Sequence, residues 1–238
     1  MDELPPAAPH GPLEEVFPGV HFVTGTMQTQ LMGAHWHFSR NMVVVRDGDA
    51  LTLINSVRLG DAGLAELEAL GSVKHVVRIG SLHGIDDAFY KTRYGATYWA
   101  VPGMPNPAGL VVDKPLVAGG EVPFPGASLF QFQSTKLPEA IVHIDRAGGI
   151  LVAADALQNW VAPDAYFSEE SRTTMAGMGF FQPANLGPVF LQVNEPKGDD
   201  YARLRGLAFK HVLPGHGSPL RDTAKEDYSA TFQRIFGV

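Results

Sequence analysis

Residues 73–103 constrain the fold of this chain more than any other stretch. The run "VKHVVRIG" (73–80) is nearly continuous in apolar residues, which is typical of a strand buried on both faces of a sheet. The segment "DDAFYKTRYG" (86–95) opens on acidic residues, which stabilise the N-terminal end of a helix, and "ATYWAVPG" (96–103) has strand composition. A strand, a helix and a strand in this order predict a βαβ unit and therefore a sheet covered by helices.

The remaining segments repeat this alternation of strands and helices. Strands are predicted within 19–27, 41–57, 127–135, 140–155 and 210–220, and helices within 61–70, 199–209 and 222–236. The segment 31–40 is predicted as a loop, and 102–126 as a long loop with one short strand at 108–113. For 160–200 two interpretations stand, irregular helices packed on the core or a lid over a pocket. Two sheets with helices outside them would satisfy this order.

Composition limits the class of protein. With 238 residues, 45% of them hydrophobic, we expect a single domain over 17–238 behind a flexible N-terminal arm, residues 1–16. The 18% of charged residues is below the ~25% of an average soluble protein, which predicts a surface partly covered in a homo-oligomer. A net charge of −7 without a run of Lys and Arg argues against nucleic acid as a partner. The lack of an apolar leader or span predicts a cytoplasmic protein with no membrane partner.

Three short stretches follow predicted strands and carry side chains suited to chemistry. They are "SLHGIDD" (81–87), Asp155 in "VAADAL" and His216 in "VLPGHG". Because ligands in layered α/β folds gather where strands end in loops, we expect these side chains to meet at one point. The chain has no cysteine, so a metal ion would have to be held by His, Asp or Glu.

The order of these segments resembles that of the metallo-β-lactamase superfamily. The stretches "RNMVVVRDGDALTLINSV", "VVRIGSLHGIDD", "ILVAADAL" and "HVLPGHG" follow the superfamily's order over roughly residues 17–220. The resemblance implies an α/β (α+β) fold, a four-layer αββα sandwich whose usual members are two-metal hydrolases. The sequence is also similar to a branch of bacterial proteins with a domain of unknown function, in which the metal-binding motif is degenerate.

The superfamily's metal loop, His-x-His-x-Asp-His, is degenerate in this chain, and two registers are possible. If Ser81 stands before the motif, Asp86 and Asp87 occupy the positions of its Asp-His pair. If His83 is the first histidine, Asp87 takes the place of the aspartate. Neither register keeps two histidines.

The later ligand positions of the superfamily are better preserved. Asp155 matches the bridging carboxylate and His216 the last histidine, whereas Lys136 stands in the segment where a further histidine is expected. The resemblance therefore implies one Zn, Fe or Mn ion at most, or no ion, with Asp87, Asp155 and His216 as catalytic residues around an activated water. The candidate ligands are His83, Asp86, Asp87, Asp155 and His216.

Simpler roles stand beside these assignments. Asp86 and Asp87 can stabilise a helix N-terminus without any metal, and His83 can cap the same helix. Asp155 needs a partner because an unpaired buried carboxylate is costly, and either a metal ion or Lys136 can supply it.

His35 and His37 allow two interpretations as well. If their segment is extended, both rings point to one side and can replace missing ligands; otherwise they are surface histidines beside Trp36.

Two functions of different classes follow. The first is a metal-dependent hydrolase of a small molecule. The second is a catalytically silent protein of the same fold that binds a small ligand or a protein partner without metal, with Lys136 and acidic residues forming a salt-bridged floor. Metal analysis of the purified protein separates the two.

Overall fold

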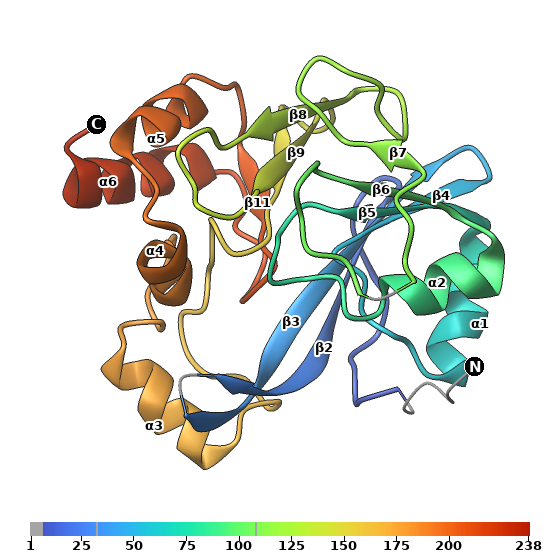
Figure 1. The fold of residues 1–238 in the computed structure, drawn as a ribbon, viewed down its shortest axis with the longest axis horizontal. Helices are drawn as coiled ribbons and strands as arrows, with labels where there is room; N and C mark the ends of the chain where they lie inside the picture. Colours follow the sequence, from blue (N-terminus) through green and yellow to red (C-terminus); the bar gives the residue numbers. More distant parts are fainter. Residues whose placement is uncertain (1–6, 32, 108) are drawn as a thin grey trace.

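The computed structural model describes residues 7–31, 33–107 and 109–238, and within them two β-sheets lie between outer helices (Figure 1). The sheets run in the orders β1-β2-β3-β4-β5-β6-β7 and β11-β10-β9-β8. The strands of the first sheet are β1 (Glu14–Phe17), β2 (Val20–Leu31), β3 (Ala34–Asp47), β4 (Ala50–Ile54), β5 (Ser72–Arg78), β6 (Thr97–Ala100) and β7 (Lys114–Pro115). Those of the second sheet are β8 (Ala127–Gln131), β9 (Ala140–Ile144), β10 (Ile150–Val152) and β11 (His211–Leu213). The helices are α1 (Asp61–Leu70), α2 (Asp87–Tyr94), α3 (Glu169–Gly177), α4 (Pro188–Asn194), α5 (Gly198–Arg205) and α6 (Ala224–Phe236).

Three apolar clusters show which surfaces the layers bury. The central cluster joins the facing sides of the two sheets, with Val77 on β5 and Val142 on β9 among its members. A second cluster packs the other side of the first sheet against α1 and α2, and a third packs the second sheet against α5 and α6. Burial of apolar area on both faces of each sheet is the main stabilising contribution to this arrangement. The architecture is the predicted αββα sandwich.

The predicted βαβ unit is confirmed as β5, α2 and β6. The two strands are parallel, with Val76 opposite Tyr98 and Val77 opposite Trp99. The helix predicted over 61–70 coincides with α1. No helix among the residues that the structure describes is both long and apolar enough to cross a membrane.

The segment 31–40 is largely strand and not the predicted loop. The hairpin of β2 and β3 continues through it to Leu31 and Ala34, Gly33 lies in the turn between them, and residue 32 lies outside the described residues. Trp36 and Phe38 alternate on β3 and pack into an apolar cluster with aromatic residues of 160–181. Long-range packing therefore extends a hairpin whose local sequence, rich in His, Ser and Gly, is typical of a loop.

The described part of the predicted flexible arm is also ordered on the sheet. Residues 14–17 form β1, and the Gly11 N–H donates to the Thr24 carbonyl at 2.8 Å. Residues 1–6 lie outside the described part of the chain.

Two further segments differ in detail from their predictions. The short strand expected at 108–113, whose first residue is not described, is displaced to β7, which begins at Lys114. In 160–200 the chain forms α3, α4 and the start of α5, and Met175 and Val189 are buried against the Trp36 cluster. The helices of this segment pack against apolar residues, as the first interpretation expects, and the segment also lines a pocket, as the second does.

Candidate metal centre

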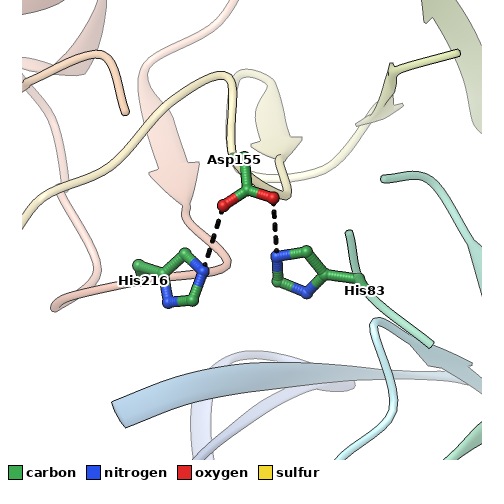
Figure 2. A group of neighbouring side chains, drawn as sticks. All are labelled: His83, Asp155 and His216. Atoms are coloured by element: carbon green, nitrogen blue, oxygen red, sulfur yellow. Dashed lines mark ion pairs between the residues drawn. The ribbon is translucent and has the colours of Figure 1, made fainter. Parts of the chain in front are cut away.

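His83, Asp155 and His216 meet beyond the ends of three strands (Figure 2). His83 lies in the loop between β5 and α2, Asp155 follows β10, and His216 follows β11. His83 Nε2 is 3.3 Å from Asp155 Oδ2, and His216 Nε2 is 3.2 Å from Asp155 Oδ1. One candidate ligand atom from each residue lies within 4.8 Å of the other two. The loops thus bring together three of the residues that the sequence singled out.

The loop that carries His83 is shaped by the buried Arg78 at the end of β5. Its guanidinium donates to the Gly80 carbonyl at 3.2 Å and to the Ser81 carbonyl at 2.6 Å. Gly84 adopts a φ of +92°, and a Cβ there would lie 2.7 Å from Arg78 Cδ. This tight turn therefore requires glycine at position 84.

The loop that carries His216 is held by β3. Asn41 Nδ2 donates to the carbonyls of Pro214 at 3.0 Å and Gly217 at 2.7 Å. The His216 Nδ1 lies 2.9 Å from the Ser39 carbonyl, which can only accept, so Nδ1 carries the proton. Nε2 is therefore the ring atom that faces Asp155 and the one that a bound ion would take as a ligand.

Glu139 is a buried carboxyl that sequence reasoning did not single out. It directly precedes β9, and its Oε1 accepts the N–H groups of Asp155 at 3.0 Å and Ala156 at 3.2 Å. The Ser81 N–H also bonds to this carboxyl. Glu139 therefore links the loop of His83 to the loop of Asp155.

The charges of the two carboxyl groups differ for physical reasons. Burial and the negative charge of Asp155 raise the pKa of Glu139 well above its usual range. Burial alone would also raise the pKa of Asp155, but the imidazoles of His83 and His216 hold it below its usual range. Burial lowers the pKa of His83, partly opposed by Asp155. Asp155 is thus the ionised member of the pair, and Glu139 the protonated one.

The donor atoms of the cluster converge closely enough to hold one metal ion. His83 Nε2 and His216 Nε2 face the two different oxygens of Asp155, at 3.3 and 3.2 Å, and one ligand atom from each residue lies within 4.8 Å of the other two. Two imidazoles and one carboxylate are also a donor set that transition metals accept. The residues present therefore fit one ion with an open coordination position.

The predicted ligands Asp86 and Asp87 are engaged elsewhere. The Asp86 carboxylate pairs with Arg40 and accepts the Arg58 N–H at 2.7 Å. The side chain of Asp87 is fully buried at the start of α2 and accepts the hydroxyl of Ser56. Neither belongs to the cluster, so the structure corrects the predicted ligand set and the catalytic role predicted for Asp87. The Asp86 side chain makes no capping hydrogen bond to α2.

Lys136 also differs from its prediction. Its Nζ lies 2.6 Å from Glu195 Oε1, and the two side chains are 58% and 54% exposed. The pocket role of Lys136, and its pairing with Asp155, are therefore wrong: Asp155 has two histidines as partners.

His35 and His37 do not join the cluster either. His35 is exposed and contacts the Gln30 side chain, and the His37 N–H donates to Ser171 Oγ at 2.7 Å. The structure places them on the extended hairpin, away from the ligand positions that they were proposed to replace.

Arg40 is the second residue of the site that sequence reasoning missed. Its guanidinium is largely buried, pairs with Asp86 and donates to the Ser56 carbonyl at 2.8 Å. The alternation of Trp36, Phe38 and Arg40 along β3 would have placed them on one face, had the segment been read as a strand.

A cavity of about 160 Å³, partly open to solvent, is lined in part by the cluster. Arg40 and the three clustered residues line its polar part. Most of its other wall is apolar: Met27, Trp36, Phe38, Trp160, Met175 and Phe180.

Comparison with known proteins identifies the fold. No protein-family model matches the chain, and no curated protein matches its sequence. Among solved structures, a metallo-β-lactamase from Hirschia baltica matches with a TM-score of 0.59 and 16% identity, over 93% of this chain and 98% of that one. A metallo-β-lactamase from Erythrobacter litoralis gives 0.57 and 14%, over 94% and 92%. The metallo-β-lactamase FIM-1 from Pseudomonas aeruginosa, in its mono-zinc form, gives 0.58 and 15%, over 97% of both chains.

Proposed function

We propose that this chain, which has the metallo-β-lactamase fold, binds one Zn, Fe or Mn ion between His83, Asp155 and His216 and hydrolyses a small molecule. The observation that carries the proposal is the convergence of two imidazole Nε2 atoms on one carboxylate in the lining of the cavity. The mono-zinc form of FIM-1 supports it, because a protein of this fold has been crystallised in a form with a single zinc. Three protein ligands leave one position open, as in catalytic zinc sites.

A bound ion of this kind lowers the pKa of a water molecule and makes it a nucleophile near neutral pH. The protein's own residues prepare the site for that chemistry. Asp155 is ionised and compensates part of the ion's charge, and the Ser39 carbonyl fixes the tautomer of His216. The aromatic walls limit water in the cavity, which strengthens the electrostatic interactions of a polarised carbonyl group.

Metal content tests the proposal. We expect full-length protein, stripped with a chelator and resupplied with zinc, iron or manganese, to retain one ion per chain, and Asp155→Asn to retain none. Asp222→Asn is the matched control, because Asp222 is an exposed aspartate at 4.0 Å from His211. At a hundredfold excess over its dissociation constant an ion stabilises a protein by about 2.7 kcal/mol, so the wild-type melting temperature should rise by about 5–11 °C.

Catalysis is measured separately with chromogenic esters, before and after metal removal. Ester turnover that is lost with the ion and absent in Asp155→Asn supports the hydrolase. Failure of the wild type to retain any of the three metals would overturn it. The alternative function was ligand binding without metal, over a pocket floor of Lys136 paired with acidic residues. The structure does not support that floor, because Lys136 pairs with Glu195 at the surface.

A further inference from the structure

The apolar wall of the cavity is built by two segments far apart in sequence. The β2–β3 hairpin supplies Trp36 and Phe38, and the segment from Trp160 to Val189 packs across from it. Phe38 and Trp160 lie edge to face with their ring centroids 6.0 Å apart, as do Trp36 and Phe180 at the same separation. The cavity thus offers a ligand aromatic surface from both segments.

The mouth of the cavity is apolar as well. Leu82 and Ile85, in the loop of His83, line it and are 43% and 55% exposed. Large aliphatic side chains exposed together at the rim of a pocket favour contact with an apolar molecule.

The charges that line the cavity are already paired. Among the described residues that line it, Arg40 is the only lysine or arginine, and its guanidinium pairs with Asp86. Asp155 is paired with the two histidines. An anionic ligand would therefore lose its hydration without finding a free cation on this wall, which is strongly unfavourable.

We infer that the cavity selects uncharged esters with an apolar acyl chain, an inference whose hydrolytic part rests on the proposed function. The acyl chain lies along the aromatic wall, and the ester carbonyl lies at the end formed by His83, Asp155 and His216. Water adds to the carbonyl carbon, the bond from that carbon to the alkoxy oxygen breaks, and the alcohol leaves with one proton of the water. The acid product ionises and leaves with the second proton of the water released to solvent.

Binding tests the selection without any need for catalysis. The uncharged probe N-phenylnaphthylamine and its sulfonate, anilinonaphthalenesulfonate, share an aromatic skeleton and become fluorescent in apolar surroundings. In protein stripped of metal, where side chains alone line the cavity, we expect the uncharged probe to bind at least about tenfold more tightly, a difference that a single unpaired charge readily produces. Equal affinity, or tighter binding of the sulfonate, would overturn the inference.

Two variants locate the effect in the cavity. Thr29 lines the cavity opposite Trp36 on the hairpin, and Thr29→Lys adds a free cation there, so the preference for the uncharged probe should fall at least about fivefold. Gln28→Lys is the matched control, because Gln28 is the next residue on the same strand, is exposed and does not line the cavity. Asp86→Asn releases Arg40 from its partner and should act in the same direction as Thr29→Lys. An unchanged preference in Thr29→Lys contradicts the inference even if Asp86→Asn fails to fold.

The hydrolytic part is tested with two esters of equal chain length. We expect kcat/KM for p-nitrophenyl hexanoate to exceed that for the mono-p-nitrophenyl ester of adipic acid, which ends in a carboxylate, by at least about tenfold. Metal-dependent hydrolysis of both esters at equal rates overturns the inference and leaves the proposed function standing. If the protein retains no supplied metal but still binds the uncharged probe selectively, the proposed hydrolase function fails and the selectivity of the cavity stands.

Discussion

Replacing Glu139 by glutamine should stabilise the metal-free protein above about pH 5, and by an amount that increases with pH. Glu139 is 1% exposed, and burial together with the charge of Asp155 raises its pKa well above the usual range of a glutamate. In the unfolded chain the same carboxyl releases its proton near the ordinary glutamate pKa of about 4.3. A glutamine keeps an oxygen that can accept the N–H groups of Asp155 and Ala156.

The direction of the effect follows from the proton that the folded state retains. The stability contributed by protonated Glu139 is complete below the unfolded pKa and decreases as the pH rises through the folded pKa. Over that window each pH unit removes about 1.4 kcal/mol from the free energy of unfolding of the wild type, and none from the glutamine variant through this group. For a chain of this length the difference in melting temperature should widen by about 3–5 °C per pH unit.

The assay is thermal unfolding of both proteins, stripped of metal, from pH 4.5 to pH 8. Comparing the two proteins at each pH removes the contributions of the other titrating groups that the substitution leaves unchanged. Glu195→Gln is the control, since Glu195 is an exposed surface partner of Lys136. A difference between wild type and Glu139→Gln that is constant across this range would refute the reasoning, as would a difference that narrows with pH.

Two further substitutions test the framework around the site. Arg78→Met removes the donors to Gly80 and Ser81 and leaves the buried Asp87 without a neighbouring cation. It should therefore lower the free energy of unfolding, measured by urea titration, by about 3–5 kcal/mol. A loss near zero would contradict the assigned role of Arg78. Lys136→Ala should leave the melting temperature unchanged, because its partner Glu195 is a surface group. A large decrease in the melting temperature would show that Lys136 neutralises a buried carboxylate instead.

Much of the fold was predictable from local pattern. The apolar run at 73–80 and the helix and strand after it obey short-range rules, so the βαβ unit formed as expected. Asp155 and His216 follow buried strands, and the ends of parallel neighbours such as β10 and β11 lie at one edge of a sheet. Their proximity was therefore predictable, whereas the register of the 81–87 loop was not.

The failed predictions share a physical cause, which is long-range packing. The histidines at 35 and 37 alternate with apolar residues, and only the aromatic partners of the 160–181 segment turn that pattern into strand. Near the site, Lys136 stands in the segment where the superfamily's further histidine is expected, three residues before Glu139, whose carboxyl accepts the Asp155 N–H. A single sequence shows that Glu139 precedes an apolar strand, but not that two other loops donate to it.

The arrangement of Glu139 beside Asp155 has a further consequence for the proposed ion. Two ionised carboxylates buried side by side repel each other, and the metal-free protein avoids this by keeping a proton on Glu139. A divalent ion held by His83, Asp155 and His216 would place two positive charges near both carboxyl groups and remove the reason for that proton. The pH-dependent gain of Glu139→Gln should therefore shrink when the ion is supplied. If the gain is the same with and without zinc, the ion does not bind beside Asp155, and the linkage between the two carboxyl groups is unrelated to metal.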